Sequence, residues 1–183
     1  GDGISGRPNM VSVPAFVPAH EPGGTGPALG RFGRKSQVST LVQQTVDAYH
    51  QDIGVTTDFR PEENSNPLAS RPTEAADRVA DPELPASIVR SVVGYLRLLA
   101  PPAPGGSTPR REQGRAVFST IGCVGCHVPV LRTGPSATLA LANREVPLFS
   151  DLLLHDMGDG LADYRVDGDA DGFGTGDAFL ACA

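Results

Sequence analysis

Apolar side chains recur at steps of three and four residues in three stretches of the chain, and this spacing predicts three amphipathic helices. The stretches cover residues 37–53, 84–99 and 109–121. The second has the broadest apolar face, and Gly94 inside it indicates a close crossing by another helix, because a mid-helix glycine is otherwise unfavourable. The pattern therefore predicts a mainly α chain.

Polar residues and prolines mark the expected ends of these helices. Ser39 is the predicted N-cap of the first helix, and Gly54 suits the left-handed position that ends it. Asp81 is the predicted cap of the second helix, because the proline that follows it suits the first helical position. Thr108 plays the same part before the third helix, again with a proline after it.

Long irregular loops separate the helices. Residues 1–36 hold many Gly and Pro and show no helical or strand period, and residues 55–80 are similar apart from a short helix expected at 74–79. The Pro/Gly-rich run that follows the second helix is typical of a linker. The predicted division is a first domain at 1–100, a linker at 101–109 and a second domain at 110–183.

Composition narrows the class of protein. The 183 residues carry a formal net charge of −6, so neither nucleic acid nor an anionic membrane is an expected partner. The longest apolar run, residues 88–100, includes Arg90 and Arg97 and is too short to span a bilayer, so no transmembrane segment is expected. There is no Trp, and such a chain fills a core poorly without a large buried group.

The sequence Cys123-Val124-Gly125-Cys126-His127 fixes the chemistry most tightly. Two thiols three positions apart on a turn, followed directly by a histidine, have the spacing that attaches haem c through two thioether bonds and ligates its iron from one side. The preceding helix places Phe118 where its ring would pack on the haem. This is the arrangement of a class I cytochrome c-like haem domain, whose haem-free form we expect to be poorly folded.

The sequence offers two candidates for the iron ligand on the side opposite His127. Met157 would give a closed iron suited to electron transfer, and His155 would give a lower potential. They are two residues apart and cannot easily both face one iron. An open position would instead admit peroxide.

The C-terminal tail is acidic and contains half of a calcium-loop pattern. Asp167, Asp169 and Asp171 alternate before a glycine, as in the first half of such a loop. The twelfth position is Ala178, where a bidentate Glu is expected. Calcium is therefore a weaker prediction than a solvated acidic loop.

Several segments, in order, resemble the bacterial di-haem oxidoreductases, a family related to the di-haem cytochrome c peroxidases and also labelled thiol oxidoreductases. The resemblance extends to about Asp163. It is carried by residues 2–9, 29–35, 95–101, 122–129 and 150–158.

The resemblance implies two c-type haem domains, one haem reacting with peroxide and the other relaying electrons from a redox partner. The chain has one Cys-x-x-Cys-His, so residues 1–100 would be the partial remainder of a first cytochrome-like domain whose motif lies upstream of Gly1. From Ala162 onward the chain departs from the family, and we expect a truncated second domain. The expected function is electron transfer by one covalent haem within a di-haem oxidoreductase, in a periplasmic or other extracytoplasmic location. The alternative is a peroxidase that reduces hydrogen peroxide.

A remoter alternative is a thiol redox or zinc module. Cys-x-x-Cys also occurs in thioredoxin-like sites, but these lie between a strand and a helix, and no strand pattern precedes Cys123. A structural zinc site needs four ligands. The remaining candidates, His155 and Cys182, are single and far apart in the sequence.

Overall fold

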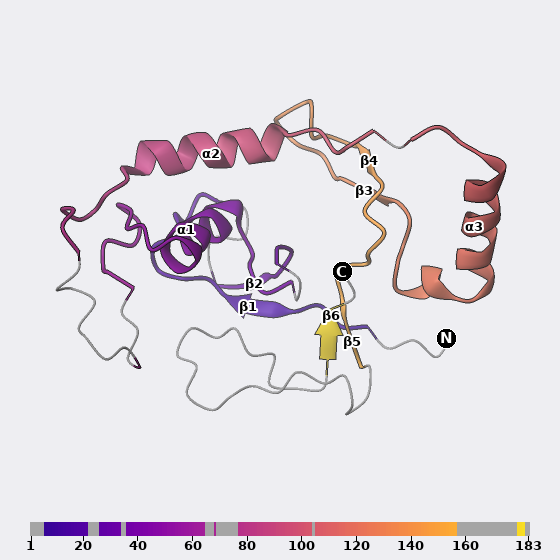
Figure 1. Cartoon of the computed structure of the whole chain (residues 1–183), viewed down its shortest axis with the longest axis horizontal. Coiled ribbons are helices and arrows are strands. Elements are labelled where there is room, and N and C mark those ends of the chain that lie inside the picture. The colour runs from indigo at the N-terminus through magenta and orange to yellow at the C-terminus, as the bar shows by residue number, and fades with distance from the viewer. Residues whose placement is uncertain are drawn as a thin grey trace. The chain divides into compact units, whose positions relative to one another are not determined.

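The computed structural model describes residues 6–21, 26–33, 36–64, 68, 77–103 and 105–156, and the backbone of 179–181 (Figure 1). These residues form three α-helices, a 3-10 helix and three two-stranded antiparallel sheets with strands of two or three residues. Contacts divide the chain into two compact units, each made of segments that are not contiguous in sequence. Unit 1 comprises Gly1–Asn9, Arg34–Gln37 and Ala100–Ala183, and unit 2 comprises Met10–Gly33 and Val38–Leu99.

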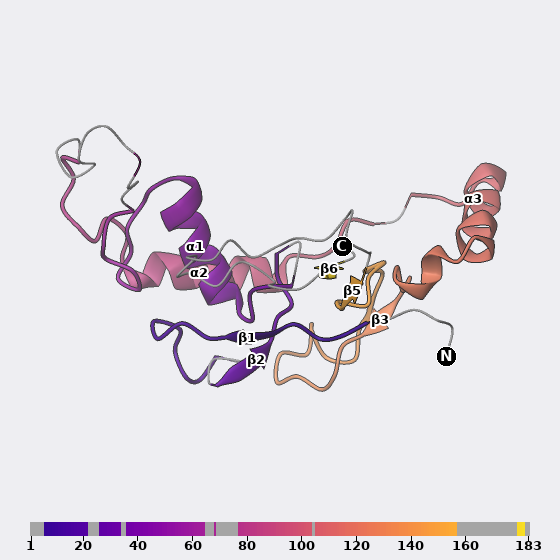
Figure 2. The ribbon, with the colours of Figure 1, turned by 90° about the horizontal axis from the view of Figure 1, so that it is seen from below.

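Unit 2 is built around two packed helices, α1 (Leu41–Asp52) and α2 (Ala86–Leu98), which lie side by side in two views (Figures 1 and 2). The apolar stripe of each helix supplies two valines to the buried core, to which Phe16, Leu41, Tyr49 and Phe59 add partly buried surface. The core valines are Val42, Val46, Val89 and Val93. A small hairpin of β1 (Met10–Ser12) and β2 (Pro27–Leu29) completes the regular structure of unit 2.

Helix α1 begins one residue later than the sequence predicts. Thr40, not Ser39, is the N-cap, and its hydroxyl oxygen accepts a hydrogen bond from the Gln43 backbone N–H at 3.1 Å. Both residues are buried hydroxyl side chains, so composition alone does not distinguish them. Gly54 has a positive φ of 65° just after the helix, as predicted.

Helix α2 begins at Ala86, so the predicted start at Asp81 and its proline is wrong. The Asp81–Pro82 peptide bond is cis, and the chain through Glu83 is irregular. The cap comes from a remote residue, because the Asp58 carboxylate accepts a hydrogen bond from the Ala86 backbone N–H at 2.7 Å. Gly94 has open space beside it, so the predicted close crossing is also absent from the part of the chain that the structure describes.

Replacing Asp58 by Ala is expected to destabilise unit 2 by about 1 kcal/mol, because α2 loses the acceptor for its first turn and a favourable charge at its N-terminus. Thermal or denaturant unfolding followed by circular dichroism measures the change. Asp52→Ala is the matched control, since Asp52 is an exposed acid in the last turn of α1, where its charge opposes the helix dipole. Equal destabilisation by both variants would contradict the assignment of Asp58 as a cap.

Asp47 on α1 makes the stability of unit 2 depend on pH. Burial raises the pKa of its carboxyl group, although the Arg60 guanidinium at 3.4 Å acts in the opposite direction. The folded chain therefore binds the carboxyl proton of Asp47 more tightly than the unfolded chain does. Protonated Asp47 contributes to the free energy of unfolding at acid pH, and this contribution is lost as pH rises through the raised pKa. The Asp47→Asn side chain cannot ionise. The stability of this variant relative to wild type should therefore be higher at neutral pH than at acid pH. The test is to measure the melting temperatures of both proteins from acid to neutral pH. A difference in melting temperature that stays constant with pH would contradict the role of Asp47.

Unit 1 contains α3 (Pro109–Thr120), which begins and ends as the sequence predicts. The Thr108 hydroxyl oxygen accepts a hydrogen bond from the Arg111 N–H at 3.3 Å, and a proline occupies the first turn. The 3-10 helix η2 (Cys123–Gly125) follows, and then the hairpin of β3 (Leu131–Arg132) and β4 (Glu145–Val146).

The last sheet of unit 1 combines distant parts of the sequence. Strand β5 (Leu154–Asp156) pairs antiparallel with β6 (Phe179–Ala181). Arg7 forms a two-way backbone bridge with Leu154, with N···O distances of 3.0 and 2.9 Å. The N-terminal segment is therefore fixed to the strand that carries His155.

The helices, at 12 or 13 residues, are much longer than the strands, yet the described chain is a mixture of both rather than purely helical. Its cytochrome-like architecture stays a prediction, as does the division at residues 100 and 110. The helix expected at 74–79 lies largely outside the described residues. Among the described residues, no helix has the length and hydrophobicity needed to cross a membrane.

Candidate functional site

The turn after α3 brings the two thiols and the histidine of the motif together. Gly122 has a φ of 87°, which only glycine adopts easily, and it directs the chain from α3 into η2. The Cys123 carbonyl then accepts hydrogen bonds from the backbone N–H groups of Cys126, at 3.3 Å, and His127, at 2.9 Å. Both cysteines are free thiols and partly exposed. A tight coil thus presents Cys123, Cys126 and His127 as a group.

The His127 ring is oriented by a backbone carbonyl. Its Nδ1 lies 2.9 Å from the carbonyl oxygen of Phe149. A carbonyl oxygen only accepts, so in the neutral ring Nδ1 carries the hydrogen and Nε2 keeps its lone pair. This is how a metal-ligating histidine is held, with its second nitrogen donating to an acceptor outside the metal.

The Phe118 ring contacts both the His127 ring and the Phe149 ring. The Phe118 ring centroid is 6.0 Å from that of His127 and 6.1 Å from that of Phe149, to which it is nearly perpendicular. The Phe149 backbone has a φ of 54°, a left-handed conformation that is strained for a side chain of this size. The Asp151 N–H donates to the Cys126 carbonyl at 3.1 Å and so ties the segment after Phe149 to the motif.

His155 contacts the second cysteine of the motif, Cys126. Its Nε2 is 2.8 Å from an Asp151 carboxylate oxygen, and its Nδ1 is 3.8 Å from the Cys126 sulfur. The ring is 3% exposed. Both ring nitrogens of His155 are therefore engaged within the site.

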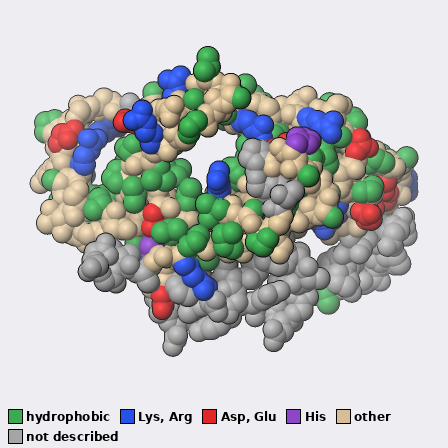
Figure 3. Space-filling model, turned by 180° about the vertical axis from the view of Figure 1, so that it is seen from behind, with side chains coloured by type: hydrophobic (Ala, Val, Ile, Leu, Met, Phe, Trp, Pro, Cys, Tyr) green, Lys and Arg blue, Asp and Glu red, His purple; other side chains and the backbone are tan. Residues whose placement is uncertain are grey.

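Apolar side chains around the motif in sequence are left uncovered. No residue of α3 is buried, and Phe118 is the only one that is even partly so. Hydrophobic side chains also reach the surface on the face drawn in Figure 3. The large exposed apolar residues of this part of the chain are Val117, Ile121, Val130, Leu139, Leu148 and Phe149.

This donor set fits a covalently attached haem. Two accessible thiols, an imidazole with a free Nε2 lone pair and an uncovered apolar surface are what a planar apolar ring with a central iron requires. A tetrahedral zinc site would need further ligands. Among the described residues, no group of three His, Cys, Asp or Glu side chains around these cysteines has its ligand atoms within 4.8 Å of one another.

A family model described as "Di-haem oxidoreductase, putative peroxidase" matches residues 1–175. The chain belongs to this di-haem oxidoreductase family. No curated protein and no solved structure was found to match it.

Membership of the di-haem oxidoreductase family confirms the resemblance seen in the sequence and supports the oxidoreductase class, with haem as the cofactor that the family implies. The match continues past Asp163, so the point at which we expected the resemblance to stop was placed too early.

The structure brings together Cys123, Cys126, His127 and Phe118, and places His155 against Cys126. The roles of these residues toward a haem stay predictions. Several other predicted site residues lie outside the described part of the chain, and so does Cys182. They are Met157 as iron ligand and Asp167, Asp169 and Asp171 as calcium ligands.

The sequence interpretation missed Phe149 and Asp151. The part of Phe149 that matters is its backbone carbonyl, which every residue has, so no sequence signal marks it. Asp151 precedes His155 by four residues, a spacing that favours contact in a helix. Here the chain between them is not helical, because Leu152 has a positive φ of 60° and β5 begins at Leu154.

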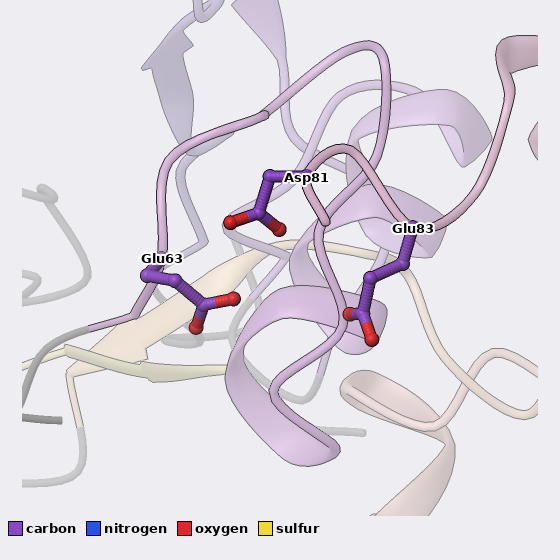
Figure 4. Close-up of side chains that lie close together, drawn as sticks. All are labelled: Glu63, Asp81 and Glu83. Atoms are coloured by element: carbon purple, nitrogen blue, oxygen red, sulfur yellow. The ribbon is translucent and has the colours of Figure 1, made fainter. Parts of the chain in front are cut away.

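A separate group of carboxylates lies in unit 2, where no sequence motif indicates a site. Oxygen atoms of Glu63, Asp81 and Glu83 lie within 4.8 Å of one another (Figure 4). Partial burial, followed by the nearby charges of Asp81, Asp77 and Glu83, raises the pKa of Glu63. Such oxygen ligands suit a hard cation. Exposed acidic groups are also common without an ion, and we assign no metal to this one.

Proposed function

We propose that the chain binds one haem covalently through Cys123 and Cys126, with His127 Nε2 as an iron ligand, and that it transfers electrons as part of a di-haem oxidoreductase. The hydrogen bond from His127 Nδ1 to the Phe149 carbonyl is the observation that carries this proposal. It fixes both the tautomer and the ring direction next to two free thiols on one turn.

The bound haem would supply a one-electron iron couple. The protein's part is to hold His127 by the Phe149 carbonyl, which also increases electron donation from the imidazole. The Phe118 ring is tilted by 53° to the His127 ring and meets the Phe149 ring edge-on, and these contacts limit rotation of the three rings. The exposed apolar residues near the motif would cover the haem faces and exclude water from them.

Met157 is our proposed second iron ligand. His155 would have to give up its contacts with Asp151 and Cys126 to reach an iron atom, and the Asp151 contact alone is a short bond to a carboxylate. A closed iron with Met favours electron transfer between a redox partner protein and the second haem site of the oxidoreductase.

The second candidate function is reduction of hydrogen peroxide by the intact enzyme, which the family description favours. It requires an open or displaceable sixth position. Because thioether attachment of haem normally takes place outside the cytoplasm, both functions place the chain in the periplasm or another extracytoplasmic compartment.

The test is expression of the chain with a secretory leader and c-type maturation factors. The expected product carries one haem mass per chain, keeps its haem after denaturation and gives the pyridine haemochrome of a thioether-linked haem. A Soret-free protein with one zinc per chain would refute the proposal and favour the zinc module. Rapid bleaching or a ferryl spectrum on adding peroxide, against an unchanged spectrum, separates the peroxidase from the electron carrier.

A further inference from the structure

The pair of buried His155 and partly buried Asp151 has no assigned role in holding the iron, yet it is built into the site. The Asp151 carboxylate accepts a hydrogen bond from His155 Nε2 at 2.8 Å, and the side chain of Asp151 is itself only 14% exposed. The two residues lie four positions apart, with Asp151 before β5 and His155 within it, so their contact is not a by-product of helical spacing.

The position of His155 is fixed from several directions. Leu154 beside it pairs with Arg7 through two backbone hydrogen bonds. A Cβ atom added to Gly6 would lie 2.8 Å from Leu153 Cδ1 and 3.0 Å from His155 Cε1, so the N-terminal segment lies close against the ring. Little room is left for another orientation of the imidazole.

The tautomer of His155 determines what its other nitrogen can do. A carboxylate is acceptor-only, so Nε2 carries a hydrogen and, in the neutral ring, Nδ1 presents a lone pair. That lone pair is 3.8 Å from the Cys126 sulfur, within reach of its S–H group. The sulfur of Cys123 has no comparable partner among the described residues. Of the two thiols of the motif, Cys126 is therefore the one that a histidine nitrogen contacts.

We infer that Asp151 and His155 are positioning residues for the thioether bond of Cys126: the pair orients the Cys126 S–H toward the haem edge and thereafter holds the sulfur in place. This inference rests on the proposed covalent haem. In the bond-forming step Cys126 Sγ joins the inner carbon of a vinyl group, the vinyl π bond breaks and the thiol hydrogen ends on the outer vinyl carbon. The addition consumes no oxidant or reductant.

His155→Gln is the first variant for the test, since its amide keeps a donor for Asp151 where Nε2 was and removes Nδ1. Expressed with maturation factors and a secretory leader, the variant should carry haem bound through Cys123 alone in most molecules. Peptide mass spectrometry locates the thioether, and the pyridine haemochrome band shifts to longer wavelength when one vinyl group remains. Gly6→Ala adds a Cβ atom that would lie 2.8 Å from Leu153 Cδ1 and 3.0 Å from His155 Cε1, so it crowds both side chains without changing the chemistry of the imidazole. It should also lower the fraction of haem bound through Cys126 relative to Cys123.

The thiol variants sharpen the test. In a Cys123→Ser background, where only Cys126 can bind, His155→Gln should lower haem attachment at least tenfold. In a Cys126→Ser background it should change attachment little. His20→Gln, at an exposed histidine of unit 2, is the matched control and should leave both thioethers intact.

The outcomes distinguish this inference from the proposed function. A wild-type chain without thioether-linked haem overturns the proposed function. A wild-type chain and a His155→Gln variant that both carry two thioethers overturn the role of His155 alone. Equal loss at Cys123 and Cys126 also overturns it, because a general folding defect would not choose between the two sulfurs.

Discussion

Joint replacement of Cys123 and Cys126 by Ser is expected to remove all covalently bound haem from the chain. The hydroxyl group of Ser does not add to a vinyl group as a thiol does, so neither side of the ring can be attached. The measurement is haem staining after denaturing electrophoresis, with the mass of the intact chain as a second readout. Cys182→Ser is the matched control and should retain a full haem mass, and retained haem in the double variant would contradict the attachment site.

The same variant is expected to lose the order of α3. No residue of this helix is buried, so its stability in the absence of haem depends on little beyond its cap. Burial of several hundred Å² of apolar ring surface is worth on the order of 10 kcal/mol at ~25 cal/mol per Å². That is comparable with the ~5–15 kcal/mol that stabilises a whole domain. Amide exchange at residues 110–120 should therefore be fast in the double Ser variant and slow in the haem-loaded wild type, and equal exchange would contradict this.

Val46→Asp is expected to unfold unit 2. Val46 is fully buried at the centre of the four-valine core between α1 and α2. Loss of its apolar burial costs about 2 kcal/mol, and an unpaired buried carboxylate adds several kcal/mol more. The sum, about 5 kcal/mol or more, takes most of the stability of a small domain. Circular dichroism should show the loss of helix signal at room temperature.

Val79→Asp is the control for this core substitution, because Val79 belongs to the same unit and is 57% exposed. It makes the same chemical change at the surface and should leave the melting temperature within a few degrees of wild type. If Val46→Asp behaved like Val79→Asp, the valine cluster would not be the core of unit 2.

Local sequence signals predicted the features of this chain that depend on neighbouring residues. The start of α3 is set by a threonine and a proline that adjoin the helix, and the motif at Cys123–His127 is contained in five residues. The start of α2 was predicted wrongly because the group that caps it, the Asp58 carboxylate, comes from 28 residues away. A cap of that kind leaves no pattern beside the helix that it stabilises.

In the candidate site, too, the residues marked by local spacing were predicted and the contacts with groups from distant parts of the sequence were not. The residues that would bind haem were evident from their spacing, whereas the group that orients His127 comes from a carbonyl 22 residues later. The contact between Cys126 and His155 spans 29 residues, and the residue before His155 is held by a backbone bridge to Arg7. The sequence identified His155 as a residue of interest, but only the three-dimensional arrangement shows that both its nitrogens face protein groups.

The bridge between Arg7 and Leu154 has a consequence for the order in which the chain can fold. Residues 6–9 belong with a strand that emerges from the ribosome almost 150 residues later, so unit 1 has high contact order and cannot finish folding during early synthesis. A fragment that starts at Ala100 would contain the whole Cys-x-x-Cys-His motif but would leave the Leu154 N–H and C=O without Arg7. Fragments for expression should therefore keep the N-terminal segment, or supply it as a separate peptide.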